Sequence, residues 1–447
     1  MLSLPVSRVR NRTCPAIVFF VPYGFRVMGR GSLFHISIGF AIVVLGAITH
    51  PPSAWGQNNR FTERSFVSSP IALGMGDAGV VLPDAENPFF YNPALLPLTA
   101  SHFTILGVQG ASSRSLPDQI SFFNNRVQPA VRSEFDVSTG ALARLHESAY
   151  GLANRPGRGH GAVLLPSFVY TPGALSVGAG LYSKTALNYR IEDGAGHIPS
   201  VWLLSRTDVM AVASMGLNLR VVGVPQVSVG LTGSQTRRFL AFKNAPLDRI
   251  REPEPAVLLE GSTFQMDLGV VYTPRWFSSV PGTVRVGGAA YDILMNGYAY
   301  TKGGRAGRLP FLDGIVGPSE SGDVAPLPRE WQRARRSFSL KPSYRVGMVY
   351  QVPSVSFMDD VAVAVDYQGY RSGEQVPLAR LHLGARAEVV GPLRVRAGLS
   401  SGYPSGGIGA RLGALEVDYA VHGEEEGRRP GQLVTYVHTA RLLLRLK

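Results

Sequence analysis

Two short motifs in the chain hold residues that could do chemistry. The run Gly398-Leu399-Ser400-Ser401-Gly402 matches a nucleophile elbow, in which a strained strand-to-helix turn exposes a serine to a histidine base. The following run Tyr403-Pro404-Ser405-Gly406-Gly407 indicates a turn into another strand, so we interpret the motif as a hairpin loop. His382 is the best candidate base, but Ser400 lies too far along the chain to be its obvious partner. We therefore expect no catalytic step.

The glycines Gly74, Gly76 and Gly79 have the spacing of a dinucleotide-binding fingerprint. That fingerprint needs a strand before it and a helix after it. Pro70 interrupts the preceding stretch, and Pro83 would stop a helix soon after Gly79. The histidines show no HxH or HxxxH spacing that would suit a metal ion. The sequence thus predicts no nucleotide, no metal and no other cofactor.

The net charge of +13 comes from 44 Lys and Arg against 31 Asp and Glu. A basic chain can be a nucleic-acid-binding protein, because clustered cations neutralise phosphates. Here the cations are mostly Arg, and they are scattered singly through apolar stretches. This distribution argues against nucleic acid as a partner.

Residues 1–56 have the features of a cleaved export signal. They carry five arginines and no carboxylate, then the apolar run 33–48, Pro51-Pro52 and the small-x-small pattern Ala54-Trp55-Gly56. The apolar run is shorter than the roughly 20 residues of a helical membrane span. We expect cleavage after residue 56, with Met28 as an alternative start. The only cysteine, Cys14, lies before this cut, so no disulfide is expected.

From residue 101 onward, apolar and polar residues alternate with a period of two, which predicts β-strands. In the stretch 381–389, for example, Leu381, Leu383 and Ala385 alternate with His382 and Gly384. Stretches of roughly nine to thirteen residues suit strands that cross a membrane at a tilt. Fifteen such stretches begin near 101, 134, 163, 174, 207, 226, 262, 283, 343, 360, 379, 393, 406, 414 and 433. Bacterial barrels normally have an even number of strands, so we prefer fourteen.

A closed membrane barrel explains this pattern better than a soluble β-sandwich. Lipid offers no hydrogen-bond partner, so every strand must pair on both sides. The polar faces hold Gly, Ser, Asn, Arg and acids, as expected of a crowded lumen. Mixed charges on these faces could form a pore constriction, but we favour paired charges that join the barrel wall to what lies inside it. The polar residues expected to face the lumen are Arg345, Arg380, His382, Arg386, Glu388, Arg394 and Arg396.

The chain therefore divides into an export signal, a segment 57–100 without alternation, and an all-β transmembrane antiparallel barrel over 101–447. Tight connections such as Pro172-Gly173 suit short periplasmic hairpins. Three stretches are rich in Gly, Pro and charge, and we expect them to be long outer loops: 184–206, 239–261 and 295–341.

The segment 57–100 carries a specific resemblance. Its runs Ala72 to Gly79 and Tyr91-Asn92-Pro93-Ala94-Leu95 resemble the "ALGMGGA…YNPAGL" stretch of FadL-like outer-membrane barrels. This superfamily includes fatty-acid and aromatic-hydrocarbon channels and the PorV-type proteins of type IX secretion. The resemblance implies fourteen strands and an N-terminal hatch inside the lumen. On this chain the hatch motif would comprise Leu73, Gly74, Met75, Gly76, Asp77, Gly79, Asn92, Pro93 and Ala94.

We expect a monomeric protein of the outer membrane of a Gram-negative-type bacterium, surrounded by outer-membrane lipid. It would pass a hydrophobic small molecule, or it would attach secreted cargo proteins as a type IX secretion component. The charged inner faces depart from the apolar hatch of the fatty-acid channels and favour the second role or a structural one. An outer-membrane lipid hydrolase and a purely structural barrel are the alternatives.

Overall fold

The computed structural model describes residues 67–84, 87–122, 125, 157–193, 199–246, 257–274, 282–294, 298–302, 342–355, 358–370, 380–425 and 434–446. The expected export signal, residue 1 to residue 56, lies outside these ranges. The helices are α2 (Pro70–Gly74), α3 (Asn87–Phe90), η1 (Pro93–Leu98), α4 (Ser115–Phe122) and η4 (Leu219–Val222). The strands are β1 (His102–Ser113), β2 (Gly157–Tyr170), β3 (Leu175–Asp193), β4 (Pro199–Asn218), β5 (Val227–Pro246), β6 (Val257–Tyr272), β7 (Thr283–Tyr291), β8 (Ala299–Lys302), β9 (Ser343–Val355), β10 (Met358–Tyr370), β11 (Leu381–Val390), β12 (Leu393–Ser400), β13 (Tyr403–Leu412), β14 (Leu415–Glu425) and β15 (Val434–Leu446).

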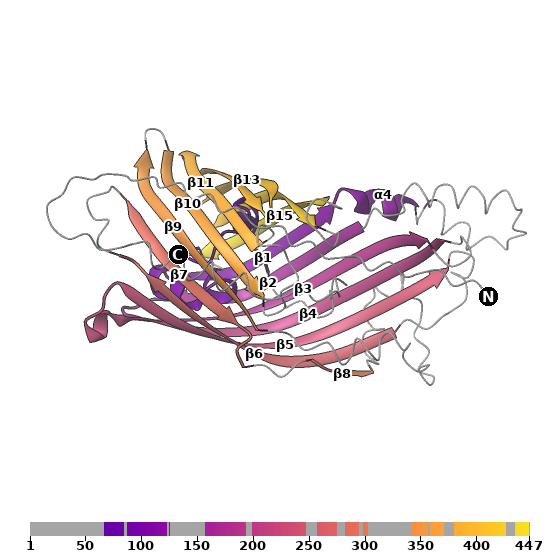
Figure 1. Cartoon of the computed structure of the whole chain (residues 1–447), viewed down its shortest axis with the longest axis horizontal. Coiled ribbons are helices and arrows are strands. Elements are labelled where there is room, and N and C mark those ends of the chain that lie inside the picture. Colours follow the sequence, from indigo (N-terminus) through magenta and orange to yellow (C-terminus); the bar gives the residue numbers. More distant parts are fainter. Residues whose placement is uncertain are drawn as a thin grey trace, which may run out of the picture. The chain divides into compact units, whose positions relative to one another are not determined.

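The strands form one closed antiparallel sheet (Figure 1). Apart from the short β8, each strand pairs with its neighbours along the chain; β7 pairs with β9, and β15 returns to pair with β1. The ring contains fourteen strands, because the short β8 pairs with β6 beyond the end of β7. The preferred count of fourteen is confirmed. The one expected stretch that matches no described strand, near 134, lies outside the described residues.

Side chains alternate between the lumen and the outer surface as the period of two predicts. On β15, Leu442 and Leu444 are 51% and 39% exposed, whereas the alternate residues Arg441 and Leu443 are 2% and 0% exposed. Apolar side chains thus cover the outside, and cations lie inside, which is the arrangement of an outer-membrane barrel. Within the described ranges, no helix is long and apolar enough to cross a bilayer.

Two of the three expected outer loops are wrong in their extent. Strands β3 and β4 occupy 184–193 and 199–206, and β5 and β6 occupy 239–246 and 257–261. These strands reach well beyond β10 to β13 (Figure 1). In these upper parts of β3 to β6 the strands remain paired, although apolar and polar residues no longer alternate as they do where the strands face lipid. Most of the third loop, 295–341, lies outside the described residues.

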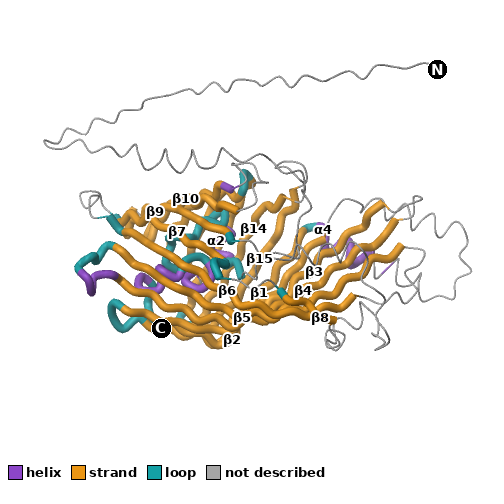
Figure 2. Tube along the Cα trace, turned by 60° about the horizontal axis from the view of Figure 1, so that its bottom comes forward, coloured by secondary structure: helices purple, strands orange, loops and turns teal. Residues whose placement is uncertain are grey.

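The N-terminal segment, defined here as the described residues 67–84 and 87–100, contacts the inner face of the barrel (Figure 2). Its short helices begin at side-chain caps: the Ser69 hydroxyl accepts from the Ile71 N–H, and Asn92 caps η1. Phe89, Phe90 and Leu96 pack with wall residues of β2, β3, β4 and β15. A second apolar group joins the segment to β6, β7, β9 and β10. The remaining residues of the expected hatch, 57–66 and 85–86, lie outside the described ranges.

Glycines of the wall allow the backbone of this segment to approach closely. A Cβ on Gly384 would lie 2.2 Å from the Met75 carbonyl oxygen, and one on Gly398 would lie 2.4 Å from the Gly76 nitrogen. Gly76 itself has a φ of +67°, a backbone conformation that residues other than glycine rarely adopt. The backbone of the segment therefore lies directly against the sheet, with no side chain between them.

Candidate functional site

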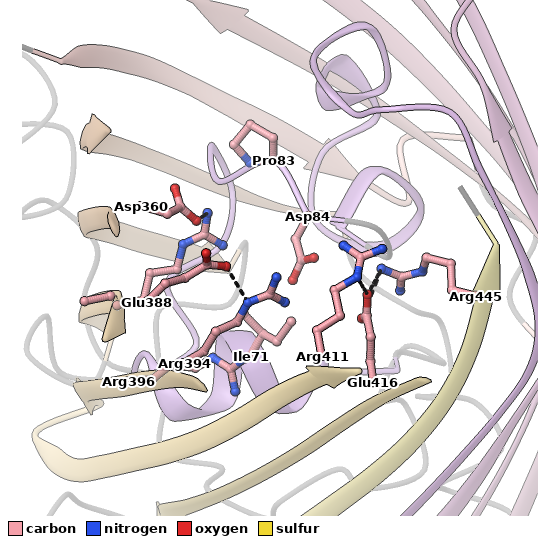
Figure 3. Close-up of a pocket in the computed structure, with 12 residues that line it drawn as sticks. Ile71, Pro83, Asp84, Asp360, Glu388, Arg394, Arg396, Arg411, Glu416 and Arg445 are labelled. Atoms are coloured by element: carbon pink, nitrogen blue, oxygen red, sulfur yellow. Dashed lines mark hydrogen bonds and ion pairs between the residues drawn. The ribbon is translucent and has the colours of Figure 1, made fainter. Parts of the chain in front are cut away.

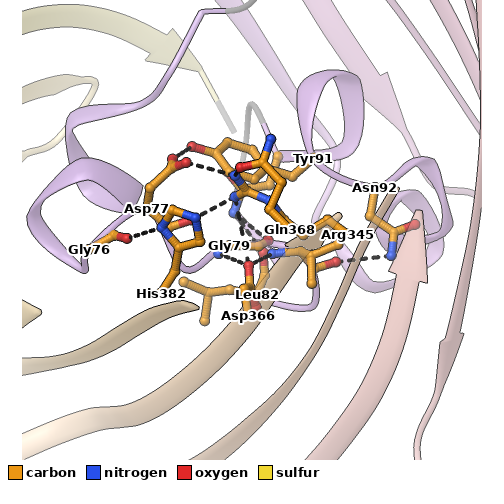
Figure 4. Close-up of polar contacts among 12 residues, drawn as sticks. Gly76, Asp77, Gly79, Leu82, Tyr91, Asn92, Arg345, Asp366, Gln368 and His382 are labelled. Atoms are coloured by element: carbon orange, nitrogen blue, oxygen red, sulfur yellow. Dashed lines mark hydrogen bonds and ion pairs between the residues drawn. The ribbon is translucent and has the colours of Figure 1, made fainter. Parts of the chain in front are cut away.

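Polar contacts between the N-terminal segment and the wall centre on Arg345 of β9 (Figure 4). The Arg345 Nη2 atom lies 2.8 Å from the Asp77 carboxylate, and Nη1 donates to the Asp77 carbonyl oxygen over 2.7 Å. Tyr91 donates its hydroxyl to the same carboxylate. A side chain of the wall thus holds both the main chain and the side chain of the segment at Asp77.

The ionisation of Asp77 and Tyr91 follows from this arrangement. Burial disfavours the charged form of Asp77, but the neighbouring Arg345 and His382 and the Tyr91 hydroxyl hold the pKa of this carboxyl below its usual value. Burial and the Asp77 carboxylate together raise the pKa of Tyr91 well above its usual value. The carboxylate therefore stays charged and the phenol stays a donor at neutral pH.

Asp366 of β10 is a second anchor for the segment. Its Oδ2 atom accepts from the backbone N–H groups of Gly79 and Val80, over 2.7 Å and 2.9 Å. The side chain is fully buried, and Arg345 lies 3.8 Å from the same oxygen. The carboxylate satisfies two backbone donors that would otherwise be buried without partners.

The predicted base His382 also faces the segment, and one expectation about it is wrong. His382 and Ser400 pair directly across β11 and β12, and the Ser400 Oγ lies 3.5 Å from Nδ1 of the ring. Antiparallel register brings them together despite their separation in sequence. However, Nδ1 donates to the Gly76 carbonyl oxygen over 2.8 Å, so this nitrogen has no lone pair to take a proton from Ser400. The expected hairpin after Ser400 is confirmed by the turn at Ser401 and Gly402.

Asn92 joins three parts of the site. Its Oδ1 atom accepts from the Ala94 N–H over 3.0 Å, and its Nδ2 atom donates to the Val80 carbonyl oxygen over 2.9 Å. The carbonyl oxygens of Val270 on β6 and Gly288 on β7 each lie 3.3 Å from Nδ2. The Asn-Pro-Ala turn of the expected motif is therefore bonded to the wall as well as to the segment itself.

Replacing Asn92 with alanine is expected to lower the free energy of unfolding by about 2 kcal/mol. The Ala94 N–H loses the side chain that caps η1, and the Val80 carbonyl oxygen loses its buried donor. Urea denaturation of the detergent-solubilised protein measures this change. Asn218→Ala is the matched control, because Asn218 also caps a short helix, through the Arg220 N–H, but at the barrel rim. We expect it to cost about 1 kcal/mol or less. Equal losses in the two variants would contradict the anchoring role of Asn92.

A charged cavity of about 180 Å³ lies between the segment residues Ile71, Pro83 and Asp84 and strands β10 to β15. It is near the short hairpins that join these strands, an end that we assign to the periplasm because periplasmic turns are short. Its charges are paired (Figure 3): Arg394 bonds Glu388 over 2.7 Å, and Arg411 and Arg445 both approach Glu416. Among the residues expected to face the lumen, the structure places Arg386, Glu388, Arg394 and Arg396 here. Arg345 and His382 lie in the contact network above, and Arg380 is buried at the start of β11.

Sequence reasoning missed a buried ion pair higher in the lumen. The Arg238 guanidinium of β5 bonds Asp208 of β4 over 2.6 Å and 3.0 Å, and both side chains are 0% exposed. Tyr298 packs over Arg238, with 4.2 Å between the guanidinium carbon and the ring centre. Neither residue was among those predicted to face the lumen. Only the register of β4 with β5 shows that they pair.

Comparisons with known proteins find likeness in structure only. No family model matches the sequence, and no curated protein matches it. The toluene transporter TbuX of Ralstonia pickettii is 13% identical, with a TM-score of 0.45 over 85% of this chain and 97% of its own. A FadL homologue of Pseudomonas aeruginosa is 11% identical, with a TM-score of 0.37 over 86% and 98%. A mutant of the monoaromatic hydrocarbon channel TodX is 10% identical, with a TM-score of 0.44 over 84% and 97%. At these identities the likeness concerns the fold alone.

Proposed function

We propose that this outer-membrane barrel passes hydrophobic small molecules from the cell exterior, and that they leave the lumen sideways into the bilayer. The N-terminal segment would close the direct path to the periplasm. The observation that carries the proposal is a change of register along β6 between its pairing with β7 and its pairing with β8. The motif resemblance of 72–79 and 91–95 to FadL-like barrels is consistent with this role.

This irregularity of the sheet is local. Between Leu268 and Ser262, β6 advances by six residues, while the facing chain advances by nine, from Ala290 to Ala299. The facing chain thus holds three more residues than β6 between these two pairs, so the ladder along β6 is irregular there. We infer that the wall can open at this irregularity.

Defined contacts hold the two sides of the irregularity. Asp292 has a φ of 56°, and its N–H donates to the Asp267 carboxylate over 2.9 Å. Gln265 donates to the Asp292 carboxylate over 2.8 Å. Tyr298, just before β8, turns inward onto Arg238. Because specific side chains hold each edge, we interpret the irregularity as a built feature of the fold and not a frayed strand end.

The alternative role in protein secretion loses its main support. It relied on the polar lumen and on three long outer loops. Most of 184–206 and 239–261 belongs to paired strands, and most of 295–341 lies outside the described residues. The charged inner faces, which also favoured it, are paired with one another and with the segment, as at Arg345 and Asp77. No described contact favours a surface for secreted cargo.

Deleting residues 295–297 tests the proposal. The deletion removes three residues and allows β7 and β8 to join in one register, which closes the wall. Cells that express the intact protein are expected to take up a labelled aromatic hydrocarbon several-fold faster than cells without it. The deletion variant should return uptake to the level of cells without the protein.

Heat-modifiable migration in electrophoresis, which distinguishes folded from unfolded barrels, serves as the folding control for the variant. If the intact protein does not increase uptake, the proposal fails. If the folded deletion variant transports as well as the intact protein, the lateral exit is wrong.

A further inference from the structure

A second cavity, of about 150 Å³, lies in the lumen between the N-terminal segment and strands β2, β3, β4 and β14. Ser68 and Leu73 of the segment form one side of it. The cavity lies far from the short turn between β2 and β3, and so toward the end of the barrel that we assign to the cell exterior. Its wall residues are Arg158, Gly159, His160, Lys184, Ala186, Asn188, Leu204, Arg206, His422 and Glu424.

The charged residues of this lining are held by other groups of the protein. Arg158 forms an ion pair with Glu424, and Arg206 lies 3.4 Å from Asp208. Lys184 also has an interaction of its own. The recognition of a ligand in this cavity therefore falls to its neutral polar groups.

Two neutral polar side chains line the cavity without a hydrogen bond to any other described residue: His160 of β2 and Asn188 of β3. Both are partly exposed. His160 pairs with Ala186, and Asn188 is two residues further along β3, so the two side chains are diagonal neighbours on one face of the sheet. An uncharged imidazole ring and an amide each offer both a donor and an acceptor. Together they suit a ligand group that can donate and accept at once.

His422 supplies a separate indication of a ligand. The residue is only 4% exposed, and its Nε2 atom lies 3.1 Å from the Glu424 carboxylate. That contact places the ring hydrogen of the uncharged imidazole on Nε2 and leaves Nδ1 as an acceptor. Nδ1 is buried and has no hydrogen-bond partner among the described residues. A hydrogen bond donated by a bound molecule would remove the cost of this unpaired acceptor.

The lining also limits the size and character of the ligand. Leu73, Ala186 and Leu204 contribute apolar surface. The volume is several times what one water molecule needs, yet below the roughly 300 Å³ of common drug-sized sites. A hydroxyl group both donates and accepts, whereas a carboxylate or an ether only accepts. A single hydroxyl on one small apolar ring fits all of these properties.

We propose that this cavity binds a small phenol, with its hydroxyl group at His160 and Asn188 and its ring against Leu73 and Leu204. The inference rests on the proposed function, because the ligand enters through the same lumen. It gives that function a solute class: neutral aromatic compounds that carry a hydroxyl group.

Isothermal titration of the detergent-solubilised barrel with phenol tests the inference, with the heat of titration into protein-free micelles subtracted. Phenol is expected to bind saturably and about fivefold or more tightly than anisole, in which a methyl group replaces the hydroxyl hydrogen. His160→Phe and Asn188→Leu fill similar space without a donor or an acceptor, and each should weaken phenol binding by about threefold to tenfold. His160→Gln, which keeps a donor and an acceptor, should retain most of the affinity.

His438→Phe is the matched control. His438 lies on β15 and contacts Tyr419 on the exposed outer side of the barrel, so phenol binding should stay unchanged. Heat-modifiable electrophoresis verifies folding of each variant. The inference is overturned by absent phenol binding, by equal binding of anisole, or by unchanged affinity in folded His160→Phe and Asn188→Leu. Binding to the purified barrel is measured independently of hydrocarbon uptake by cells, so either proposal can fail while the other holds.

Discussion

Replacing Asp366 with alanine is expected to release the N-terminal segment from the wall and to raise ion conductance in a planar lipid bilayer at least tenfold. The Asp366 carboxylate accepts the N–H groups of Gly79 and Val80. Without it, both donors stay buried and unpaired, at a cost of about 1–3 kcal/mol each. That cost favours states in which the segment leaves its place and water fills the lumen.

Two comparisons make this prediction specific. Asp366→Asn keeps an oxygen acceptor but loses the charge beside Arg345, so its conductance should be intermediate. Asp360→Asn is the matched control, because Asp360 bonds the wall residues Gln351 and Arg386 and is partly exposed. Its conductance should match that of the unchanged protein. An Asp366→Ala barrel that conducts no better than Asp360→Asn would show that other contacts suffice to hold the segment.

Replacing Arg238 with methionine is expected to lower the free energy of unfolding by about 3–5 kcal/mol, because Asp208 stays buried without its main partner. Arg206, 3.4 Å from Asp208, compensates only in part. The packing of Arg238 against Tyr298 is also lost. Urea denaturation in detergent micelles or lipid vesicles measures the change.

The adjacent residue provides the control. Arg237 lies on the same strand but faces outward, with its side chain 50% exposed, and it forms an ion pair with Glu260. Exposed pairs contribute about 1 kcal/mol or less, so Arg237→Met should have a small effect. Replacing both Asp208 and Arg238 by apolar residues should cost less than Arg238→Met alone. If Arg237→Met is as harmful as Arg238→Met, the buried pair has no special role.

Local pattern was enough to predict much of the fold. The alternation of apolar and polar residues reports which side chains share a face, because successive side chains of a strand point to opposite sides. It predicted the closed barrel, fourteen strands, and the apolar outside of β15 at Leu442 and Leu444. It failed for the upper parts of β3 to β6, where strands continue beyond the apolar band and residues on both faces can be polar.

The contacts of the site depend on register between segments that are distant in sequence. Asp366 and the Gly79 N–H it accepts are 287 residues apart, and no local pattern relates them. The pairing of His382 with Ser400 follows from the register of the β11–β12 hairpin. A shift of one residue in that register would turn the Ser400 side chain to the opposite face of the sheet.

By itself, then, the sequence determined a membrane barrel with inward charges and a motif-bearing segment before the first strand, because these follow from the period of the chain and from what lipid requires of a backbone. Only the tertiary structure decided which carboxylate meets which arginine, and where the chain that faces β6 changes register after Tyr291. Those features depend on how fourteen strands align around the ring, and alignment is a property of the closed sheet and of no single strand.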